Sequence, residues 1–444
     1  MSVYDEYRSK LRTADEAVRL VKNGDWVDYA SNNGFPKTLD AALAKRRDEL
    51  WGVKIRGNLI SGPIQVAECD TGFEHFVYNS WFCSAYERRL IDAHRAFFIP
   101  MDFRNMGAYY ENYLTVNVAM LAVTPMNDKG YFSRSTCQGL PKAIIDKANI
   151  VILEVNEALP WMCGGEESYV HISEADVVVE AGSYPLLEMK APRPSETEVR
   201  IAQNLLPFIK NGATVQLGIG GVPNALGELI ADSDLKDLGM HTELAADGYL
   251  AMYRAGKLTN RCKTLHPGKS VAAIAMGTRD FYDWIDHNDE FLGLPLSYVN
   301  DPHVLAKNNS MISINGCLNV DLYGQVNAES VGFRQISGTG GQLDFVAGAV
   351  HSAGGKAFLC LPSTHTGKDG TVQSRIVPHF NMDIITTPRS MCHYIVTEYG
   401  AVNLAGLTTW ERAEALISVA HPDFRDGLIK NAQEQHIWLP SNKR

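Results

Sequence analysis

The two halves of this chain repeat one pattern of residues, and this repeat strongly limits the folds that the chain can adopt. Residues 23–29 begin with Asn-Gly and lead to Pro36, and residues 211–217 begin with Asn-Gly and lead to Pro223. Further along, residues 118–130 resemble 311–324, and residues 150–156 resemble 357–362. Any two α/β halves share some strand–turn–helix patterns. Here the order of the matched segments, the Asn-Gly pairs and the prolines also agree. A period of ~200 residues is too long for a solenoid, so the repeat predicts two duplicated domains.

Short apolar runs rich in β-branched residues alternate with helical patterns in both halves. We expect strands over 151–155, 177–180, 214–217, 271–276 and 358–361, and helices over 38–48 and 224–231. This alternation predicts an α/β fold made of two open, mostly parallel α/β/α domains. A proline-rich stretch and a capping box, Ser195 to Glu198, mark the border, so we expect an N-terminal domain over 1–192 and a C-terminal domain over 193–444.

The composition fits a globular enzyme and argues against several other classes. The net charge of −10 argues against nucleic acid or an anionic membrane as partner, and no apolar run approaches the ~20 residues that span a bilayer. The eight cysteines include no C-x-x-C pair, and the 13 histidines form no metal-binding pattern. We therefore expect reduced thiols, no metal site, no targeting segment and a cytoplasmic location.

A glycine-rich turn, made of Gly218, Ile219, Gly220 and Gly221, follows the expected strand that ends at Leu217. It does not complete a G-x-G-x-x-G dinucleotide fingerprint, and no phosphate-loop lysine follows it. Glycines let the main chain approach a ligand, and the N-terminus of the next helix presents amides that favour negative charge. The turn is therefore either a ligand site of this kind or a tight packing turn.

A second glycine cluster lies at 337–345, ahead of a helical pattern over 345–351, and is either functional or a flexible surface turn. Glu243 ends the expected strand 238–244 and has no basic residue beside it in the chain. No G-x-S-x-G motif is present, so a serine hydrolase has no support. A lone carboxylate near glycine-rich turns indicates a site for acyl chemistry.

Six motifs together resemble those of the class I coenzyme A transferases. They lie at 217–221, 241–243, 320–327, 338–345, 396–400 and 420–425. The most similar group comprises the butyryl-CoA:acetate and 4-hydroxybutyrate CoA-transferases of the acetyl-CoA hydrolase/transferase family. The resemblance covers essentially the whole chain.

The resemblance implies roles for single residues. The family's catalytic glutamate falls on Glu243, and an active-site asparagine falls on Asn300, which its Asn-Asp-Pro context alone would mark as an ordinary turn. Main-chain amides at Ile219 and Gly341 would form the oxyanion hole. The implied CoA contacts are Leu217, Gly218, Ile219, Gly220, Gly221, Leu318, Gly340, Gly341 and Lys368.

The resemblance also implies a reaction. CoA would pass between an acyl-CoA and a short-chain carboxylic acid by ping-pong chemistry through a glutamyl-CoA thioester, with CoA as a substrate and no tightly bound cofactor. A homodimer or higher homo-oligomer is expected. An acyl-CoA hydrolase that uses the same glutamate and a non-catalytic CoA-binding protein are the alternatives.

Three segments of the first half are expected to line the acyl pocket, namely 29–34, 79–85 and 133–138. The polar residues Ser31, Asn32 and Asn33 favour a hydroxy acid or dicarboxylate over a plain short-chain acid. Arg134 either contributes to that choice or is a solvated loop charge.

Overall fold

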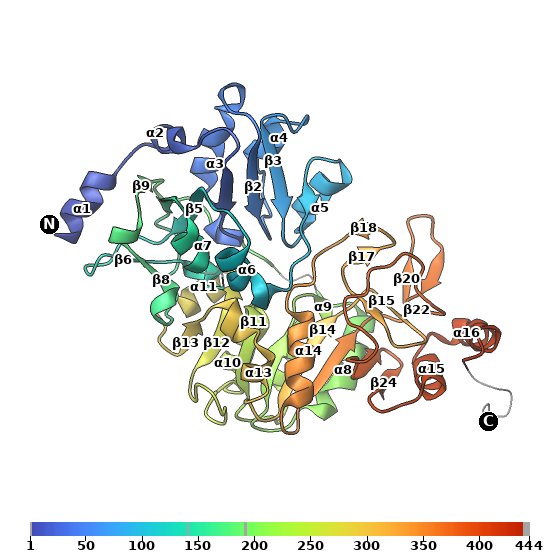
Figure 1. Cartoon of the computed structure of the whole chain (residues 1–444). Helices are drawn as coiled ribbons and strands as arrows, with labels where there is room; N and C mark the ends of the chain where they lie inside the picture. Colours follow the sequence, from blue (N-terminus) through green and yellow to red (C-terminus); the bar gives the residue numbers. More distant parts are fainter. Residues whose placement is uncertain (1, 140–141, 191–192, 438–444) are drawn as a thin grey trace. The chain divides into compact units, whose positions relative to one another are not determined.

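The computed structural model describes residues 2–139, 142–190 and 193–437 (Figure 1). Their contacts form two compact units. Unit 1 comprises the chain up to Met189 together with Val271–Val299 and Gln335–Gly340, and unit 2 comprises Lys190–Ser270, Asn300–Arg334 and the chain from Gly341 onward. The sequence-based border at 192/193 is a single cut, whereas unit 1 also takes in two segments from the second half; the two-domain assignment stays a prediction.

Unit 1 is built on a seven-stranded sheet in which all strand pairs are parallel. In spatial order its strands are β4 (Phe97–Phe98), β3 (Phe76–Ser80), β2 (Val53–Gly57), β1 (Trp26–Tyr29), β5 (Val118–Val123), β7 (Ile150–Val155) and β9 (Val177–Glu180). Every residue of β5 is buried, as expected for an apolar central strand that is covered on both faces.

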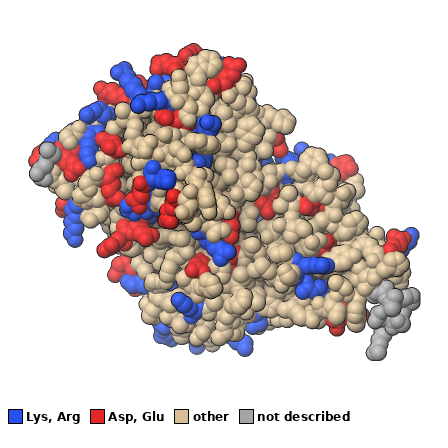
Figure 2. Space-filling model, viewed as in Figure 1, with Lys and Arg blue, Asp and Glu red and all other residues tan. Residues whose placement is uncertain are grey.

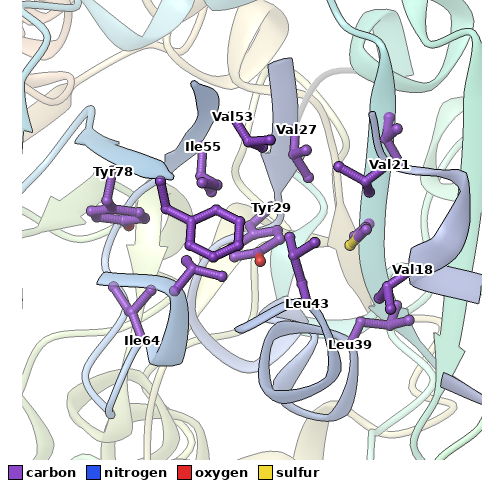
Figure 3. Close-up of a cluster of buried hydrophobic side chains, with 14 of the residues drawn as sticks. Val18, Val21, Val27, Tyr29, Leu39, Leu43, Val53, Ile55, Ile64 and Tyr78 are labelled. Carbon is purple, nitrogen blue, oxygen red and sulfur yellow. The ribbon is translucent and has the colours of Figure 1, made fainter. Parts of the chain in front are cut away.

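The core of unit 1 packs the sheet against helix α3 (Lys37–Ala44). Figure 3 shows Leu39 and Leu43 from this helix facing a cluster that includes Val27 and Ile55 from β1 and β2. The other helices of unit 1 are α1 (Val3–Lys10), α2 (Ala14–Ala17), α4 (Gln65–Cys69), α5 (Ala85–Asp92), α6 (Met106–Asn112), α7 (Lys142–Lys147), α11 (Arg279–Ile285) and α12 (Leu296–Val299). Its further strands are β6 (Tyr131–Ser133), β8 (Tyr169–His171), β13 (Phe291–Gly293) and, apart from its first residue, β12 (Ser270–Ala275).

Unit 2 holds a second mostly parallel sheet. Its strands in spatial order are β11 (Gly239–Ala245), β10 (Thr214–Leu217), β14 (Met311–Gly316), β19 (Lys356–Cys360), β23 (Tyr394–Thr397) and the antiparallel edge strand β24 (Gly400–Asn403). Shorter strands beside it are β15 (Asn319–Asp321), β16 (Val326–Asn327), β17 (Ser330–Val331), β18 (Arg334–Gln335), β20 (Thr364–Thr366), β21 (Val372–Ser374) and β22 (Ile376–Val377).

The first helix of unit 2 begins where its capping box predicts, whereas the helices expected over 224–231 and 345–351 each begin three residues earlier, at Gly221 and Gln342. The capping box predicted at Ser195 and Glu198 is formed, and it opens the first helix of this unit. These helices are α8 (Glu196–Leu205), α9 (Gly221–Asp232), α10 (Asp247–Arg254), α13 (Pro302–Leu305), α14 (Gln342–His351), α15 (Thr409–Ser418) and α16 (Pro422–Glu434). No helix within the described segments combines the length and the apolar character that crossing a bilayer requires.

The two sheets have the same strand order. In unit 1 the sequence β2-β1-β5-β7-β9 occupies the places that β11-β10-β14-β19-β23 occupies in unit 2. The register agrees as well, because Val27 pairs with Val118 as Val215 pairs with Ile312. The repeats found in the sequence therefore fall on corresponding strands, and the predicted duplicated α/β fold is confirmed.

Candidate functional site

The glycine turn 218–221 joins β10 to α9 at the carboxyl end of a parallel strand, which is where open α/β sheets bind ligands. Gly220 is the N-cap residue of α9 and has a φ of 122°, a conformation that residues with a side chain rarely adopt. No side chain caps the helix, and the side chain of Ile219 is 46% exposed. The turn thus exposes main chain at Ile219 and Gly220, whereas Gly221, the first residue of α9, is buried.

Glu243 lies in β11, two residues before the strand ends, and is half-buried. Asn300 is fully buried just ahead of α13, and its Nδ2 donates a hydrogen bond of 2.5 Å to Oε2 of Glu243. A carboxylate only accepts hydrogen bonds, so this contact fixes which atom of the Asn300 amide is the donor. The short bond holds the carboxylate in one orientation.

Gly341 closes the cluster as the N-cap residue of α14. A Cβ atom built on Gly341 would collide with Nδ2 of Asn300 and with Oε2 of Glu243. The φ of this residue is −107°, which most residues can adopt, so glycine is required here for space and not for backbone conformation. Three of the predicted site residues, Glu243, Asn300 and Gly341, are therefore brought together within unit 2.

Hydrogen bonds of Gln216, in the strand that leads into the glycine turn, connect that strand to β14. Oε1 of Gln216 accepts hydrogen bonds from Oγ of Ser313 at 2.8 Å, from the main-chain N–H of Ile314 at 3.1 Å and from Nδ2 of Asn315 at 3.2 Å. Gly218 donates its N–H to the carbonyl of Ile314 at 2.9 Å. The sequence reasoning missed Gln216; the signal available was an amide side chain inside an otherwise apolar strand.

In unit 1 the turn that corresponds to the glycine turn lies between β1 and α3. It differs from the glycine turn in what lies at the N-terminus of the helix that follows. There Glu154 of β7 accepts hydrogen bonds from the main-chain N–H groups of Thr38 and Leu39, at 3.2 and 2.8 Å, in the first turn of α3. In sheet register Glu154 corresponds to Cys360 of unit 2, because Ala122 pairs with Glu154 as Gly316 pairs with Cys360. Unit 1 thus fills its own helix N-terminus with a carboxylate, whereas unit 2 has a thiol at that register.

The other predicted CoA contacts are spread over separate elements. Leu217 is the last residue of β10, and Leu318 lies between β14 and β15, where its carbonyl accepts a hydrogen bond from Nη1 of Arg375 at 2.8 Å. Lys368 is exposed in the turn that joins β20 to β21. Gly340, with a φ of 55°, belongs to unit 1, where its carbonyl accepts the N–H of Phe103 at 3.3 Å.

The polar segments expected to line an acyl pocket lie in unit 1. Segments 29–34 and 133–138 pack together, because Sγ of Cys137 donates to the carbonyl of Ser31 at 2.6 Å. Asn32 and Ser135 both have positive φ angles, 51° and 54°, and both are buried. Such strained polar residues cluster at functional sites, and the pocket itself stays a prediction.

Arg134 is not a solvated loop charge, so that alternative was wrong. Its side chain is 2% exposed, and its Nη2 donates to the carbonyls of Gln138, at 3.3 Å, and of Glu167. Burial lowers the pKa of Arg134 to about 10, which still leaves it charged at neutral pH. The sequence showed a polar segment, and only the folded chain turns that guanidinium inward onto main-chain carbonyls.

A cavity of about 880 Å³ lies between α8 and α9 in unit 2. Its lining includes Arg193, Arg200, Glu196 and Glu228, so both signs of charge face it, and it does not include Glu243. On the face shown in Figure 2, basic and acidic side chains are interspersed. The described residues hold no group of three or more His, Cys, Asp or Glu side chains suited to a metal ion.

The chain is similar to known proteins along both of its halves. The family model of the acetyl-CoA hydrolase/transferase N-terminal domain matches residues 1–187, and that of the C-terminal domain matches residues 277–432. The butyryl-CoA:acetate CoA-transferase of Anaerostipes caccae is 45% identical over 100% of both chains. The 4-hydroxybutyrate coenzyme A transferase of Clostridium kluyveri is 40% identical over 97% of this chain and 98% of its own.

Among solved structures, RipA from Yersinia pestis superposes with a TM-score of 0.90 at 35% identity, over 99% of this chain and 100% of that one. Family models and full-length relatives agree in both halves of the sequence. The chain therefore belongs to the acetyl-CoA hydrolase/transferase family.

Proposed function

We propose that this chain transfers CoA from an acyl-CoA to a free carboxylic acid through a glutamyl-CoA thioester on Glu243. The relatives that are 40% and 45% identical to it are named CoA-transferases, and the chain is an enzyme of that type. The observation that carries the mechanistic proposal is the cluster in which Asn300 donates to Glu243 and Gly341 leaves room for both. A partly exposed carboxylate that is held in one orientation is suited to act as a nucleophile.

In the first half-reaction, a carboxylate oxygen of Glu243 attacks the thioester carbonyl of the acyl-CoA. The carbon–sulfur bond breaks, CoA leaves as a thiolate, and a mixed anhydride joins the acyl group to Glu243. The thiolate then attacks the glutamyl carbonyl and expels the acyl group as a free carboxylate. The product is a thioester between Glu243 and CoA, and no proton or electron has to be supplied from outside.

The second half-reaction reverses these steps with a different acid. The carboxylate of the acceptor attacks the glutamyl-CoA thioester, which releases the thiolate and forms a new mixed anhydride. The thiolate attacks the acceptor's carbonyl, so a new acyl-CoA leaves and Glu243 regains its carboxylate. Donor and acceptor thus use one site in turn.

Each attack places a negative charge on a carbonyl oxygen. Main-chain N–H groups of Ile219 and Gly341 are proposed to stabilise this charge, and Asn300 to hold Glu243 in the attacking orientation. In other acyl-transfer sites the loss of one such donor costs about 3–4 kcal/mol. Leu217 to Gly221, Leu318, Gly340 and Lys368 are proposed to contact CoA, whose binding energy would hold the thioester at the reacting carboxylate.

The proposed substrates are those of the relatives, an acyl-CoA with acetate, butyrate or 4-hydroxybutyrate as the acid. The buried polar residues Ser31, Asn32 and Asn33 support a hydroxy acid among the acceptors. A homo-oligomeric assembly and a cytoplasmic location are part of the same proposal, and size-exclusion chromatography with light scattering tests the first of these.

Initial-rate kinetics separate transfer from hydrolysis, the second activity that the family model's description includes. Acyl-CoA donor and acid acceptor should be varied together while free CoA and both acyl-CoA species are followed by chromatography. Transfer predicts parallel double-reciprocal lines, as in other ping-pong reactions, and turnover that requires the acceptor. Release of free CoA at the same rate without any acceptor would instead establish a hydrolase.

A further inference from the structure

Strands β10 and β11 separate at their carboxyl ends, and the two branches carry the two parts of the candidate site. The ladder between them joins Thr214 to Gly239 and Val215 to Met240, and within this described part of the chain it goes no further. Beyond it, β10 leads into the glycine turn 218–221, whereas β11 continues to Glu243. Main-chain groups of β10 that face the gap therefore need partners other than the neighbouring strand.

The hydroxyl of Tyr249, from α10, lies in this gap. Leu217 donates its N–H to the Tyr249 hydroxyl at 2.7 Å, and that hydroxyl lies 3.5 Å from the carbonyl of Val215. Oγ1 of Thr242 completes the set, because it lies 3.4 Å from the carbonyl of Leu217 and 3.1 Å from that of Leu244. Tyr249 and Thr242 are buried, so water does not replace these bonds.

The two helices that follow the separated strands are also in close contact. A Cβ atom built on Gly227 of α9 would lie 3.0 Å from the Cα atom of Gly248 in α10. The backbones of α9 and α10 therefore touch near the point where Tyr249 leaves its helix. The contact between α9 and α10 therefore restrains the backbone beside Tyr249, and the hydrogen bond from Leu217 restrains its hydroxyl.

We propose that Tyr249 is a positioning residue for the transfer reaction, because its hydroxyl fixes the glycine turn 218–221 relative to Glu243. This inference rests on the proposed function. Leu217, directly before the turn, donates its N–H to the Tyr249 hydroxyl and accepts a hydrogen bond from Oγ1 of Thr242, directly before Glu243. The side chains of Tyr249 and Thr242 are also hydrogen-bonded to each other. The hydroxyl of Tyr249 is thus hydrogen-bonded to both strands, at Leu217 and Thr242. It acts through the distance between the Ile219 amide and the attacking oxygen of Glu243.

The substitution Tyr249→Phe tests this role, because it removes only the hydroxyl and leaves the N–H of Leu217 buried without its partner. Tyr78→Phe is the matched control. Tyr78 is also fully buried, and its hydroxyl donates to Oε1 of Glu87 at 2.7 Å, but it lies in β3 of unit 1. Both variants lose the hydrogen bonds of a buried tyrosine hydroxyl, so both should melt at a lower temperature than wild type.

The two variants should differ in the chemistry. We would mix each protein with butyryl-CoA in a rapid-quench instrument and measure the rate at which the CoA adduct of the protein forms. Tyr249→Phe should slow adduct formation about tenfold, since a misplacement of about 1 Å can cost about 100-fold and the loss of one hydroxyl should move the turn by less than that. Tyr78→Phe should form the adduct at the wild-type rate. The isosteric variant Thr242→Val should also form the adduct more slowly than wild type.

The outcomes that overturn the proposal are distinct. If Tyr249→Phe is folded and forms the adduct as fast as wild type, the hydroxyl serves stability alone and the positioning role is wrong. If Tyr78→Phe slows the adduct as much as Tyr249→Phe, the effect is a general loss of stability and the role is also wrong. If wild type forms no adduct at all, the proposed function fails, and this inference fails with it.

Discussion

Replacing Gly341 by alanine should abolish most of the activity while leaving the protein folded. The added Cβ atom would occupy the space in which Oε2 of Glu243 and Nδ2 of Asn300 now meet. The backbone of Gly341, with a φ of −107° and a ψ of 13°, does not oppose the change. The strain must therefore be relieved by the two side chains.

The expected magnitudes follow from which atoms can move. Glu243 is half-buried and its Oε2 is the far end of a flexible side chain, so it can turn away at a cost of about 1 kcal/mol for an unfavourable rotamer. The free energy of unfolding should fall by about that amount. The rate should fall far more, by about 100-fold to 1000-fold, because the carboxylate and a proposed oxyanion donor lose their mutual alignment.

The assay compares kcat of the transferase reaction with the urea midpoint of the same protein samples. Gly427→Ala is the control: Gly427 lies in α16, and a Cβ atom built there meets nothing within 4 Å, so this variant should keep full activity and gain up to about 1 kcal/mol of stability. A Gly341→Ala protein with wild-type kcat would refute the reasoning. So would a Gly341→Ala protein that loses activity only because it unfolds.

Three further predictions address separate parts of the chain. Asn300→Ala removes the hydrogen bond to Glu243 and should lower kcat about 100-fold in steady-state assays; an unchanged kcat would show that the amide does not orient the nucleophile. Glu154→Gln weakens the carboxylate contacts with the first turn of α3 and should lower the free energy of unfolding by about 2–3 kcal/mol in urea titrations, whereas no loss would mean that α3 does not need them. Lys263 is buried, and its Nζ donates to the carbonyls of Met240 and Lys269 at 2.8 and 2.6 Å; burial lowers its pKa from 10.5 to about 7. Between pH 7 and pH 10.5 the unfolded chain binds a proton at Lys263 that the folded chain lacks. The free energy of unfolding should therefore rise with pH in this range, by about 1.4 kcal/mol per pH unit. Below pH 7 this dependence on pH should be absent. Relative to Lys263→Met, wild type should therefore gain about 2–3 kcal/mol between pH 7 and pH 9, and parallel pH profiles of the two proteins would contradict the assignment.

Local sequence signals predicted much of the fold. The strands expected over 177–180 and 214–217 have the same bounds in the structure, and the Ser195 capping box is formed. These features depend on residues close together in the chain, such as β-branched runs and a cap with its partner three residues on. The repeat of the halves also came from the sequence, because duplicated strands keep their Asn-Gly turns.

Contacts between distant residues could not be predicted in this way. Asn300 follows the signals of an ordinary turn, and only the folding of unit 2 brings its amide to Glu243, 57 residues earlier in the chain. The residues around Tyr249 in the chain carry no signal of its position, since that depends on where two strands separate. The burial of Arg134 could not be predicted either, because the residues around it in the chain are polar. Its guanidinium donates to the carbonyls of Gln138 and Glu167 only in the folded chain.

The most direct test of the account is to find the covalent intermediate. The protein should be incubated with butyryl-CoA in the absence of any acceptor acid, then digested and analysed by tandem mass spectrometry. We predict that the peptide containing Glu243 gains the mass of CoA less one water, that acetate removes this adduct, and that Glu243→Ala does not form it. An enzyme that turns over butyryl-CoA and acetate without any adduct at Glu243, or with the adduct at another residue, would contradict the central claim.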